Sequence, residues 1–364
     1  MGKVKNVKKG GVRMGKLKFR LVNLALVCLF VFGGSPKGFS QNAREIKSLI
    51  RNLEVGQPLF YENLTIIPIY NTRINNHIKY VTLDRALKKG WLEIKELDGG
   101  RVPEVQLSNK SNNHIYIMGG EILTGCKQDR IVGRDVLIKP KSRNILVPVY
   151  CVEQGRWNYE SDNFYSQSNL GTYKLRSQAQ IAGSEAQTRI WEGVSDMSRS
   201  LGVSSGTNAY QEIYEDKEVS KRVKKIERYI QSVPQLHSDT VGVVVGLGSK
   251  IVSVDIFANP YLFKALWPKL AKSSALSAVN ESSTGTITQT DAAQFLRTLH
   301  DKTYIQKSAI DLGFELSVSD HSANINALVY AGSVIHLAGF SQDNNNKSYY
   351  QNHDRGRRIP VMIR

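Results

Sequence analysis

Two clusters of polar and charged residues, close together in the sequence, hold most of the side chains that could do chemistry. The first cluster runs from Glu121 to Arg130, and the second runs from Cys151 to Trp157. Glycines punctuate both clusters, and the segment between them has the pattern of two short β-strands. We therefore predict that the clusters are loops at one edge of a β-layer, that they face each other, and that they share an opening.

A pair of carboxylates, one from each cluster, gives the first functional hypothesis. Glu121 and Glu153 are the candidate catalytic residues, because a carboxyl group buried beside apolar strands has a raised pKa and can donate a proton near neutral pH. The pair predicts a hydrolase that acts on a glycosidic or phosphoester bond. Cys151 could act as a nucleophile only with a base, and for this the sequence offers only a distant histidine such as His336.

Basic, amide and aromatic side chains in the same clusters give a second hypothesis, which is ligand binding. The candidate ligand-binding residues are Lys127, Gln128, Arg130, Gln154, Arg156 and Trp157. Guanidinium groups match a phosphate or carboxylate with two hydrogen bonds at a time. The Trp157 ring could stack on a base or a sugar, unless it is a half-buried core residue. This set predicts a small anionic or nucleotide-like ligand held between the two loops.

A third hypothesis for the same clusters is structural. The cations would then pair with Glu121, Asp129 and Glu153 in an ion network that fixes the loops, as in a structural or interaction protein. Arg134 and Asp135, just beyond the first cluster, would form a pair at the surface. The sequence leaves the three hypotheses open, and with them the question of whether the protein is an enzyme.

Several other chemistries have no support in the sequence. The seven histidines are scattered and no pair has the spacing of metal ligands, so no metal site is predicted and no cofactor is indicated. The glycines of GLGSK, which begins at Gly246, lack the spacing of a phosphate-binding loop. One basic run lacks the interleaved aromatic residues of a nucleic-acid interface, so we expect a solvated helix face and no nucleic-acid partner. That run comprises Lys221, Arg222, Lys224, Lys225 and Arg228.

The first forty residues have the order of a secretory signal. They contain seven lysines and two arginines without an acidic residue, and so hold much of the formal charge of +17. A basic segment ends at Arg20, an apolar run spans Leu21 to Phe32, and small residues follow it. The run is shorter than the roughly 20 apolar residues that span a bilayer. We predict a signal peptide over 1–40, cleavage near Ser40, and an exported chain without a membrane partner. An uncleaved anchor and a start at Met14 remain alternatives.

Export bears on the two cysteines that the mature chain would keep. Cys126 and Cys151 lie one in each cluster, and disulfides persist in oxidising compartments. Either they form a bridge that pins the loops together, or they are two buried thiols.

The first half of the chain must supply the β-layer that positions these loops. The predicted strands are Leu64–Tyr70, the runs from Trp91, Val102 and His114, Arg130–Ile138, and Arg143–Val149. Pro68 argues for an edge or a bulge in the first of them. A short helix over Thr82–Lys89 ends at Gly90. We expect a β-meander or a small sandwich.

The second half is patterned for helices and a closing set of strands. Helices are predicted after a Ser184–Gln187 capping box, over Val219–Val233, from an Asn259–Pro260 start, and from a Thr290 cap. Pro268 should kink or end the third of these helices. Strands are predicted in a hairpin from Val241 and over Gly313–Val318, Ala323–Tyr330 and Ser333–Phe340. The prediction is one α+β domain over 41–340, followed by a polar flexible tail over 341–364.

Several of these segments together resemble one bacterial family. They are TIIPIY, YVTLDRALKKGWLEIKEL, GGEILTGCKQDRI, VPVYCVEQGRW, SEAQTRIW and GVVVGLGSKIVSVDIFANPYLFKALWPKLAKS. The chain from Leu64 to Phe340 is similar to the ADP-ribosylglycohydrolase (ARG) and rhodanese-phosphatase-superfamily-associated domain. The resemblance implies an association with ADP-ribose metabolism, and hence an ADP-ribose-like ligand, but no reaction. Export counts against an NAD-linked substrate, which is scarce outside the cytoplasm.

Overall fold

The computed structural model describes residues 40–41, 43–74, 76–97, 101–181, 183 and 185–342. The predicted signal peptide lies outside the described residues except for Ser40. The predicted tail lies outside them except for Ser341 and Gln342. Ser341 is the last residue of a strand rather than the first residue of a tail.

A ten-stranded antiparallel sheet joins the start and the end of the described chain. In spatial order its strands are β1 (Ser40–Gln41), β16 (Tyr304–Ser308), β17 (Phe314–Ser319), β18 (Ala323–Tyr330), β19 (Ser333–Ser341), β15 (Lys250–Phe257), β14 (Thr240–Leu247), β4 (Leu64–Asn71) and β2 (Leu53–Val55), with β3 (Leu59–Tyr61) also on β4. Successive side chains of a strand point to opposite faces. Leu64 and Ile66 accordingly enter one hydrophobic core, and Ile67 and Ile69 enter another on the opposite face.

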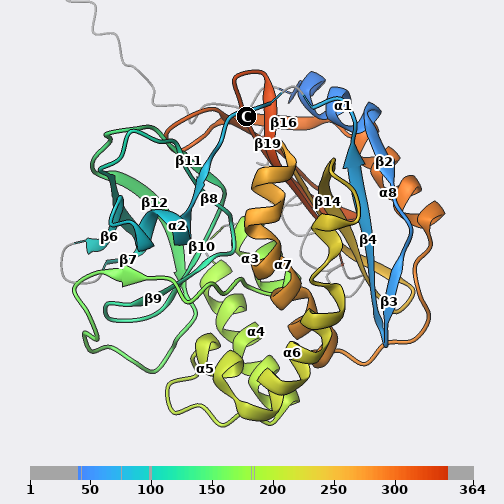
Figure 1. The fold of residues 1–364 in the computed structure, drawn as a ribbon. Helices are drawn as coiled ribbons and strands as arrows, with labels where there is room; N and C mark the ends of the chain where they lie inside the picture. The colour runs from blue at the N-terminus through green and yellow to red at the C-terminus, as the bar shows by residue number, and fades with distance from the viewer. Residues whose placement is uncertain are drawn as a thin grey trace, which may run out of the picture. The chain divides into compact units, whose positions relative to one another are not determined.

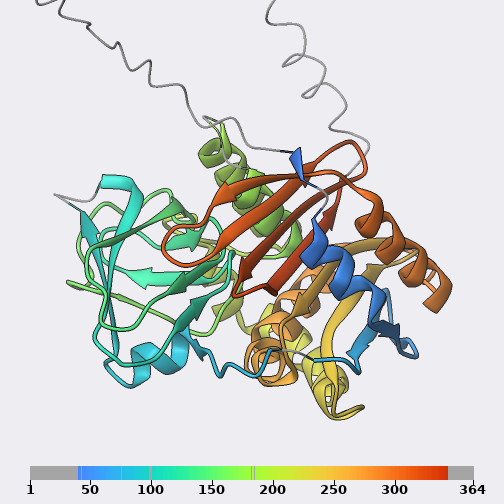
Figure 2. The same cartoon turned by 90° about the horizontal axis from the view of Figure 1, so that it is seen from above.

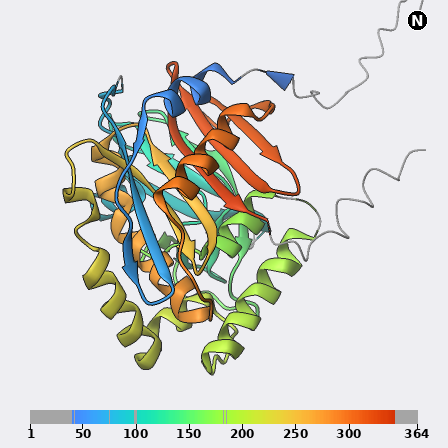
Figure 3. The ribbon, with the colours of Figure 1, turned by 90° about the vertical axis from the view of Figure 1, so that its right-hand side faces the viewer.

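Helices cover both faces of this sheet. One face packs on α3 (Tyr173–Ile181), α4 (Ala186–Leu201), α5 (Tyr210–Glu215), α6 (Lys217–Ile230), η1 (Val233–Gln235) and α7 (Pro260–Asn280). The other face packs on α1 (Arg44–Arg51) and α8 (Gln289–Asp301). Figure 1 shows α7 at the centre of the first group, and Figure 3 shows α1 and α8 on their side of the sheet.

A smaller β-module lies beside the large sheet, in teal and green in Figures 1 and 2. Its six-stranded sheet has the order β13 (Phe164–Tyr165), β9 (Ile122–Gly125), β10 (Arg130–Val132), β12 (Ile145–Cys151), β7 (Arg101–Asn109) and β6 (Leu92–Leu97). A three-stranded sheet contains β11 (Val136–Ile138), β8 (Ile115–Ile117) and β5 (Val81–Thr82), next to α2 (Leu83–Lys88). The module has its own hydrophobic core, and both polar clusters belong to it.

The α+β class is confirmed, and the first half of the chain is rich in strands as predicted. One detail of the strand prediction is wrong. The predicted strand Arg130–Ile138 is two strands, β10 and β11, in different sheets. The first half also contributes to the large sheet, because β4 pairs along its length with β14. Pro68 lies on β4 between the stretches that pair with β2 and β3, where the ladder is interrupted.

Two predicted helix caps differ from the structure, and one of the two predicted effects of Pro268 is excluded. Pro268 lies inside α7 and does not end it. The carbonyl four residues earlier, on Lys264, belongs to the exposed side of the helix, where water can replace the missing hydrogen bond. The cap of α8 is Thr288, which forms a capping box with Asp291, rather than Thr290. Gln187 bonds to the backbone of Cys151 instead of capping α4, and Ser184 lies outside the described residues. No helix in the described part of the chain is long and apolar enough to cross a membrane.

Candidate functional site

The two polar clusters lie directly against each other, as the sequence predicts. β10 pairs antiparallel with β12, so that Arg130 is opposite Cys151 and the two loops begin side by side. The Gln128 side chain donates to the Glu153 carbonyl at 2.8 Å, and the Asp129 amide donates to the Glu153 carboxylate at 3.1 Å. These bonds fix one loop against the other.

Arg156 is the centre of the contacts between the loops. Its Nη2 lies 2.6 Å from Glu153 Oε2, 3.1 Å from Asp129 Oδ1 and 3.3 Å from Glu160 Oε2. Its Nη1 donates to the Cys126 carbonyl at 2.7 Å. The side chains of Arg156, Asp129 and Glu153 are 17%, 6% and 6% exposed, so this is a largely buried network. The ion network of the structural hypothesis therefore exists around Arg156.

A cavity of about 570 Å³ opens beside this network, and we call it the acidic cavity. Its charged lining residues are Asp129, Glu153, Arg156, Glu160, Glu212 and Glu215. Tyr165, Gln167, Thr207 and Gln211 add a ring, two amides and a hydroxyl group. Five carboxyl groups therefore face one guanidinium, and that guanidinium is already shared among three of them.

The carboxyl group of Asp129 has a pKa that is shifted into the neutral range. Burial is the largest cause and raises the pKa of Asp129 to about 7. The nearby Glu153 and Glu160 charges raise it further, whereas the Gly125 amide and Arg156 oppose the shift. Near neutral pH, Asp129 therefore carries a proton in about half of the molecules and could donate it.

Glu121, the other predicted catalytic residue, lies elsewhere. It is fully buried, accepts a hydrogen bond from the Met118 amide at 2.8 Å, and forms an ion pair with Lys269 of α7. Burial raises the pKa of Glu121, and Lys269 opposes that rise. Lys269 also contacts Asp84 of α2 at 2.7 Å. Glu121 does not line the acidic cavity, so the structure does not bring Glu121 and Glu153 into one site.

Most of the predicted ligand-binding residues have other surroundings. The buried Arg130 lies 3.3 Å from Glu96 and over the Phe164 ring, and the buried Gln128 holds the two loops together. Lys127 lies over the rings of Trp157 and Tyr159, on an exposed surface where Trp157 is 52% exposed. Gln154 is exposed, and its carbonyl accepts from Gln128. Of the eight predicted site residues, the acidic cavity includes Glu153 and Arg156.

The cysteines are two buried thiols, which was one of the two alternatives. Burial raises the pKa of Cys126 and of Cys151 to about 11, so neither is a thiolate at neutral pH. Cys151 donates to the Gln128 amide oxygen at 3.2 Å. His336 bonds to other side chains, Asp135 and Asp255, and is therefore not the base for Cys151.

A buried ion network around His336 was not anticipated. His336 Nδ1 is 2.8 Å from Asp135, its Nε2 is 3.0 Å from Asp255, and Arg176 pairs with Asp255. Burial alone would lower the pKa of His336, but the two aspartates outweigh it and raise the pKa to about 9. The prediction that Asp135 pairs with Arg134 at the surface is wrong. Asp135 is buried against His336, and Arg134 pairs with Glu315.

The far wall of the acidic cavity was also missed. It comes from the loop after β13, which carries Gln167, and from the segment around α5, which carries Thr207, Gln211, Glu212 and Glu215. The feature of the sequence that could have indicated this wall was the dense polar composition of α5, YQEIYE. That helix has only six residues, too few for a clear periodic pattern. Among the described residues, no group of three or more His, Cys, Asp or Glu side chains is arranged to hold a metal ion.

The fold and the site define an α+β protein with two pinned loops beside an acidic cavity. Within that class, the chain belongs to the ARG and Rhodanese-Phosphatase-superfamily-associated Protein domain family, whose model matches residues 52–340. The resemblance seen in the sequence is thereby confirmed. The biochemical function of the family is unknown. Searches of curated proteins and of solved structures give no significant match.

Proposed function

We propose that this protein is a binding module for a small molecule and that the acidic cavity is its site. The observation that carries the proposal is the lining of that cavity, in which five carboxyl groups face one guanidinium. The Arg156 network fixes the walls, because it ties Asp129, Glu153 and Glu160 to the same side chain. The structural and binding hypotheses are thus compatible, since a fixed wall lowers the ordering cost of binding.

The charge of the lining favours an amine-bearing ligand over an anion. A unit charge about 4 Å from a carboxylate gains or loses about 1 kcal/mol in water and about 4 kcal/mol near a protein surface. The sequence predicted an anionic ligand, but these carboxylates would repel an anion. Lys127 and Arg130 could not offset the repulsion, because Lys127 lies over the Trp157 ring and Arg130 pairs with Glu96. An ammonium group could pair with Glu212 and Glu215, and the half-exposed Tyr165 ring could pack on its carbon skeleton.

Calorimetric titration with matched ligands tests this proposal. Glucosamine and glucose differ in one amine, and spermidine and ADP-ribose carry opposite charges. We expect glucosamine and spermidine to bind, and glucose and ADP-ribose to bind at least about tenfold more weakly, which is about 1.4 kcal/mol. Tight binding of ADP-ribose without binding of either amine would overturn the proposal and favour the anionic ligand.

Matched variants of the protein test whether the ligand binds in the acidic cavity. The double variant Glu212→Gln, Glu215→Gln removes two charges from the lining. Glu185→Gln is the control, because its side chain is 60% exposed at the start of α4 and is not among the cavity residues. We expect amine affinity to fall about tenfold or more in the double variant and to be unchanged in the control. Equal affinity in all three proteins would exclude this cavity.

A second candidate function is hydrolysis of a glycosidic or phosphoester bond. Asp129 Oδ1 and Glu153 Oε2 both contact Arg156 Nη2, so they are no farther apart than the sum of the 3.1 Å and 2.6 Å contacts. Carboxyl groups about 5–5.5 Å apart are typical of retaining glycosidases. In this candidate Asp129, rather than Glu121, is the acid. Asp129→Asn should then abolish turnover of aryl glycosides or phosphodiesters without loss of ligand binding, whereas a binding module shows no turnover to lose.

We also propose that the chain is exported after cleavage near Ser40. The support is the order of basic, apolar and small residues over 1–40. N-terminal sequencing of the protein recovered from each cell fraction tests it. The expected result is an N-terminus at Gln41 in the exported fraction, and a cytoplasmic protein that retains residues 1–40 would exclude it.

A further inference from the structure

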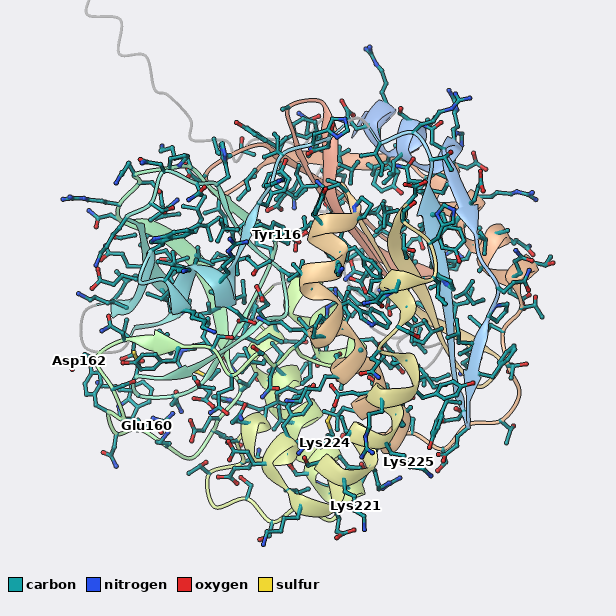
Figure 4. The ribbon with its side chains drawn as sticks, viewed as in Figure 1. Tyr116, Glu160, Asp162, Lys221, Lys224 and Lys225 are labelled. Atoms are coloured by element: carbon teal, nitrogen blue, oxygen red, sulfur yellow. The ribbon has the colours of Figure 1, made fainter. Side chains whose placement is uncertain are left out.

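A second cavity, of about 200 Å³, adjoins the acidic cavity and shares Gln167, Gln211 and Glu215 with it. We call it the lysine cavity, because Lys272 of α7 lies in its wall. Lys224 and Glu227 of α6 also line it. Figure 4 labels Lys224 together with Lys221 and Lys225, which belong to the same helix α6. This cavity therefore brings two amines and two carboxyl groups from three helices together.

A directed chain of hydrogen bonds fixes the Lys272 amine. Its Nζ bonds to Asn169 Oδ1 and lies 4.5 Å from the centre of the Tyr214 ring. Asn169 Nδ2 donates to Gln211 at 2.6 Å, and Gln211 Nε2 donates to Glu215 at 2.9 Å. A carboxylate only accepts, so Glu215 sets the orientation of the Gln211 amide, and Gln211 in turn sets that of Asn169, whose oxygen accepts from Lys272. Because Asn169 and Gln211 are buried, the chain has little freedom to rearrange.

The surroundings of Lys272 shift its amine toward the uncharged form. Burial is the largest cause and lowers the pKa of Lys272, the nearby Lys224 charge lowers it further, and Glu227 and Glu215 oppose the change. Burial likewise raises the pKa of Glu227. A lysine desolvated beside another cation is the usual form of a nucleophilic amine in proteins.

We propose that Lys272 is a covalent attachment site for an aldehyde or ketone, which it binds as an imine in the lysine cavity. The Nζ lone pair attacks the carbonyl carbon, and the carbonyl oxygen takes a proton, while nitrogen loses one, to give a carbinolamine. The hydroxyl group then leaves as water with a proton from the Glu227 carboxyl group as the C=N bond forms, and the resulting Glu227 carboxylate takes the remaining proton from nitrogen to give the neutral imine. Amine and carbonyl thus give imine and water, with no oxidant or reductant. This site goes beyond the proposed function and does not depend on an amine ligand in the acidic cavity.

Reductive trapping tests the proposal on the full-length protein. The protein is incubated at pH 7 with propanal and sodium cyanoborohydride, which reduces an imine to a stable secondary amine, and labelled lysines are mapped by mass spectrometry over time. We expect Lys272 to be labelled several-fold faster than the exposed Lys221, because the lowered pKa of Lys272 raises its share of free amine. Equal or slower labelling of Lys272 would overturn the proposal.

Two further measurements separate a reactive amine from a merely accessible one. Lys224→Ala should slow the labelling of Lys272 several-fold at pH 7, because it removes the neighbouring cation. Lys221→Ala, on the exposed part of the same helix, should leave the rate unchanged. The second measurement is the dependence of the labelling rate on pH in the unaltered protein, which does not require any variant to fold. The midpoint for Lys272 should lie below the ordinary value for a lysine, and a midpoint at or above that value would again overturn the proposal.

Discussion

The raised pKa of Asp129 predicts that Asp129→Asn stabilises the protein in a pH-dependent way. In the folded chain the pKa of Asp129 is about 7, against an ordinary value of 3.8. A raised folded pKa contributes stability that is present below pH 3.8 and is lost as the pH rises to 7. Asparagine has nearly the same shape and can still accept from the Gly125 amide, but it carries no charge to bury.

The size of this effect follows from the shift. About three pKa units at 1.36 kcal/mol per unit give about 4 kcal/mol at pH 8, where Asp129 is ionised in both states. At pH 5 Asp129 is protonated in the folded chain, and the pH lies only about one unit above the ordinary pKa that applies in the unfolded chain. The gain in the free energy of unfolding is therefore roughly 1–2 kcal/mol at pH 5. Asp129→Asn should therefore raise the free energy of unfolding at both pH values, and by about 2–3 kcal/mol more at pH 8 than at pH 5.

Urea denaturation at pH 5 and pH 8 measures this difference. Asp196→Asn is the control, because Asp196 is 71% exposed on α4 and its substitution should change stability by less than about 0.5 kcal/mol. A destabilised Asp129→Asn variant at pH 8 would show that Asp129 is held as a favourable carboxylate, and the same gain at both pH values would show that Asp129 does not titrate between them in the folded protein. The reasoning on the acidic cavity would then be wrong for this residue.

Three other substitutions test the buried interior. A protonated His336 contributes about 3 kcal/mol of stability below pH 6.5, and this contribution is lost as the pH rises to about 9. His336→Gln should remove it, and urea denaturation across that pH range measures the loss. Lys269→Met leaves Glu121 buried without its cation and should lower the free energy of unfolding by about 3–5 kcal/mol. Gly120→Ala should cost about 3 kcal/mol or more in the same assay. Gly120 has φ +98°, and an added Cβ would lie 2.4 Å from a stem carbon of the buried Arg176.

Each of these variants has a matched control at an exposed position. His321→Gln and Lys264→Met replace exposed side chains and should each change stability by less than about 0.5 kcal/mol. Gly202→Ala keeps a positive φ of +69° with no atom within 4 Å of the added Cβ, so it should show only the backbone cost of about 1 kcal/mol. If Gly120→Ala costs no more than Gly202→Ala, the contact with Arg176 is not restrictive.

Local signals in the sequence were sufficient for many single elements. The β14–β15 hairpin forms about Gly248, which has φ +57°, and Asn259 caps α7 ahead of Pro260 as predicted. These features depend on residues within a few positions of one another. The pairing of the two polar loops was also predictable, because β10 and β12 are near neighbours in the chain.

Contacts across long separations were not predictable from the residues alone. His336 and Asp135 are 201 positions apart, and Lys269 and Glu121 are 148 positions apart. The local sequence around a charged loop residue is the same whether its side chain is exposed to solvent or pairs with a partner in the core. For this reason Arg130, which pairs with the buried Glu96, was assigned to a ligand. The distinction depends on the tertiary packing and not on the local sequence.

The acidic cavity and the Arg156 network are coupled through the proton on Asp129, and this coupling gives a final prediction. At pH 7 Asp129 is protonated in about half of the molecules. A bound ammonium group favours the ionised form of a nearby carboxyl group, so amine binding should lower the pKa of Asp129. Binding at pH 7 should therefore release up to about half a proton per site.

Calorimetric titration in two buffers of different ionisation enthalpy measures this release. The apparent binding enthalpy should depend on the buffer at pH 7, and the dependence should disappear in Asp129→Asn and well above pH 7, where Asp129 is already ionised. Uptake of protons, or binding that is independent of the buffer at pH 7, would mean that the amine does not reach Asp129. The ligand would then lie on the Glu212 and Glu215 side of the cavity, and Arg156 would hold the opposite wall without sensing what is bound.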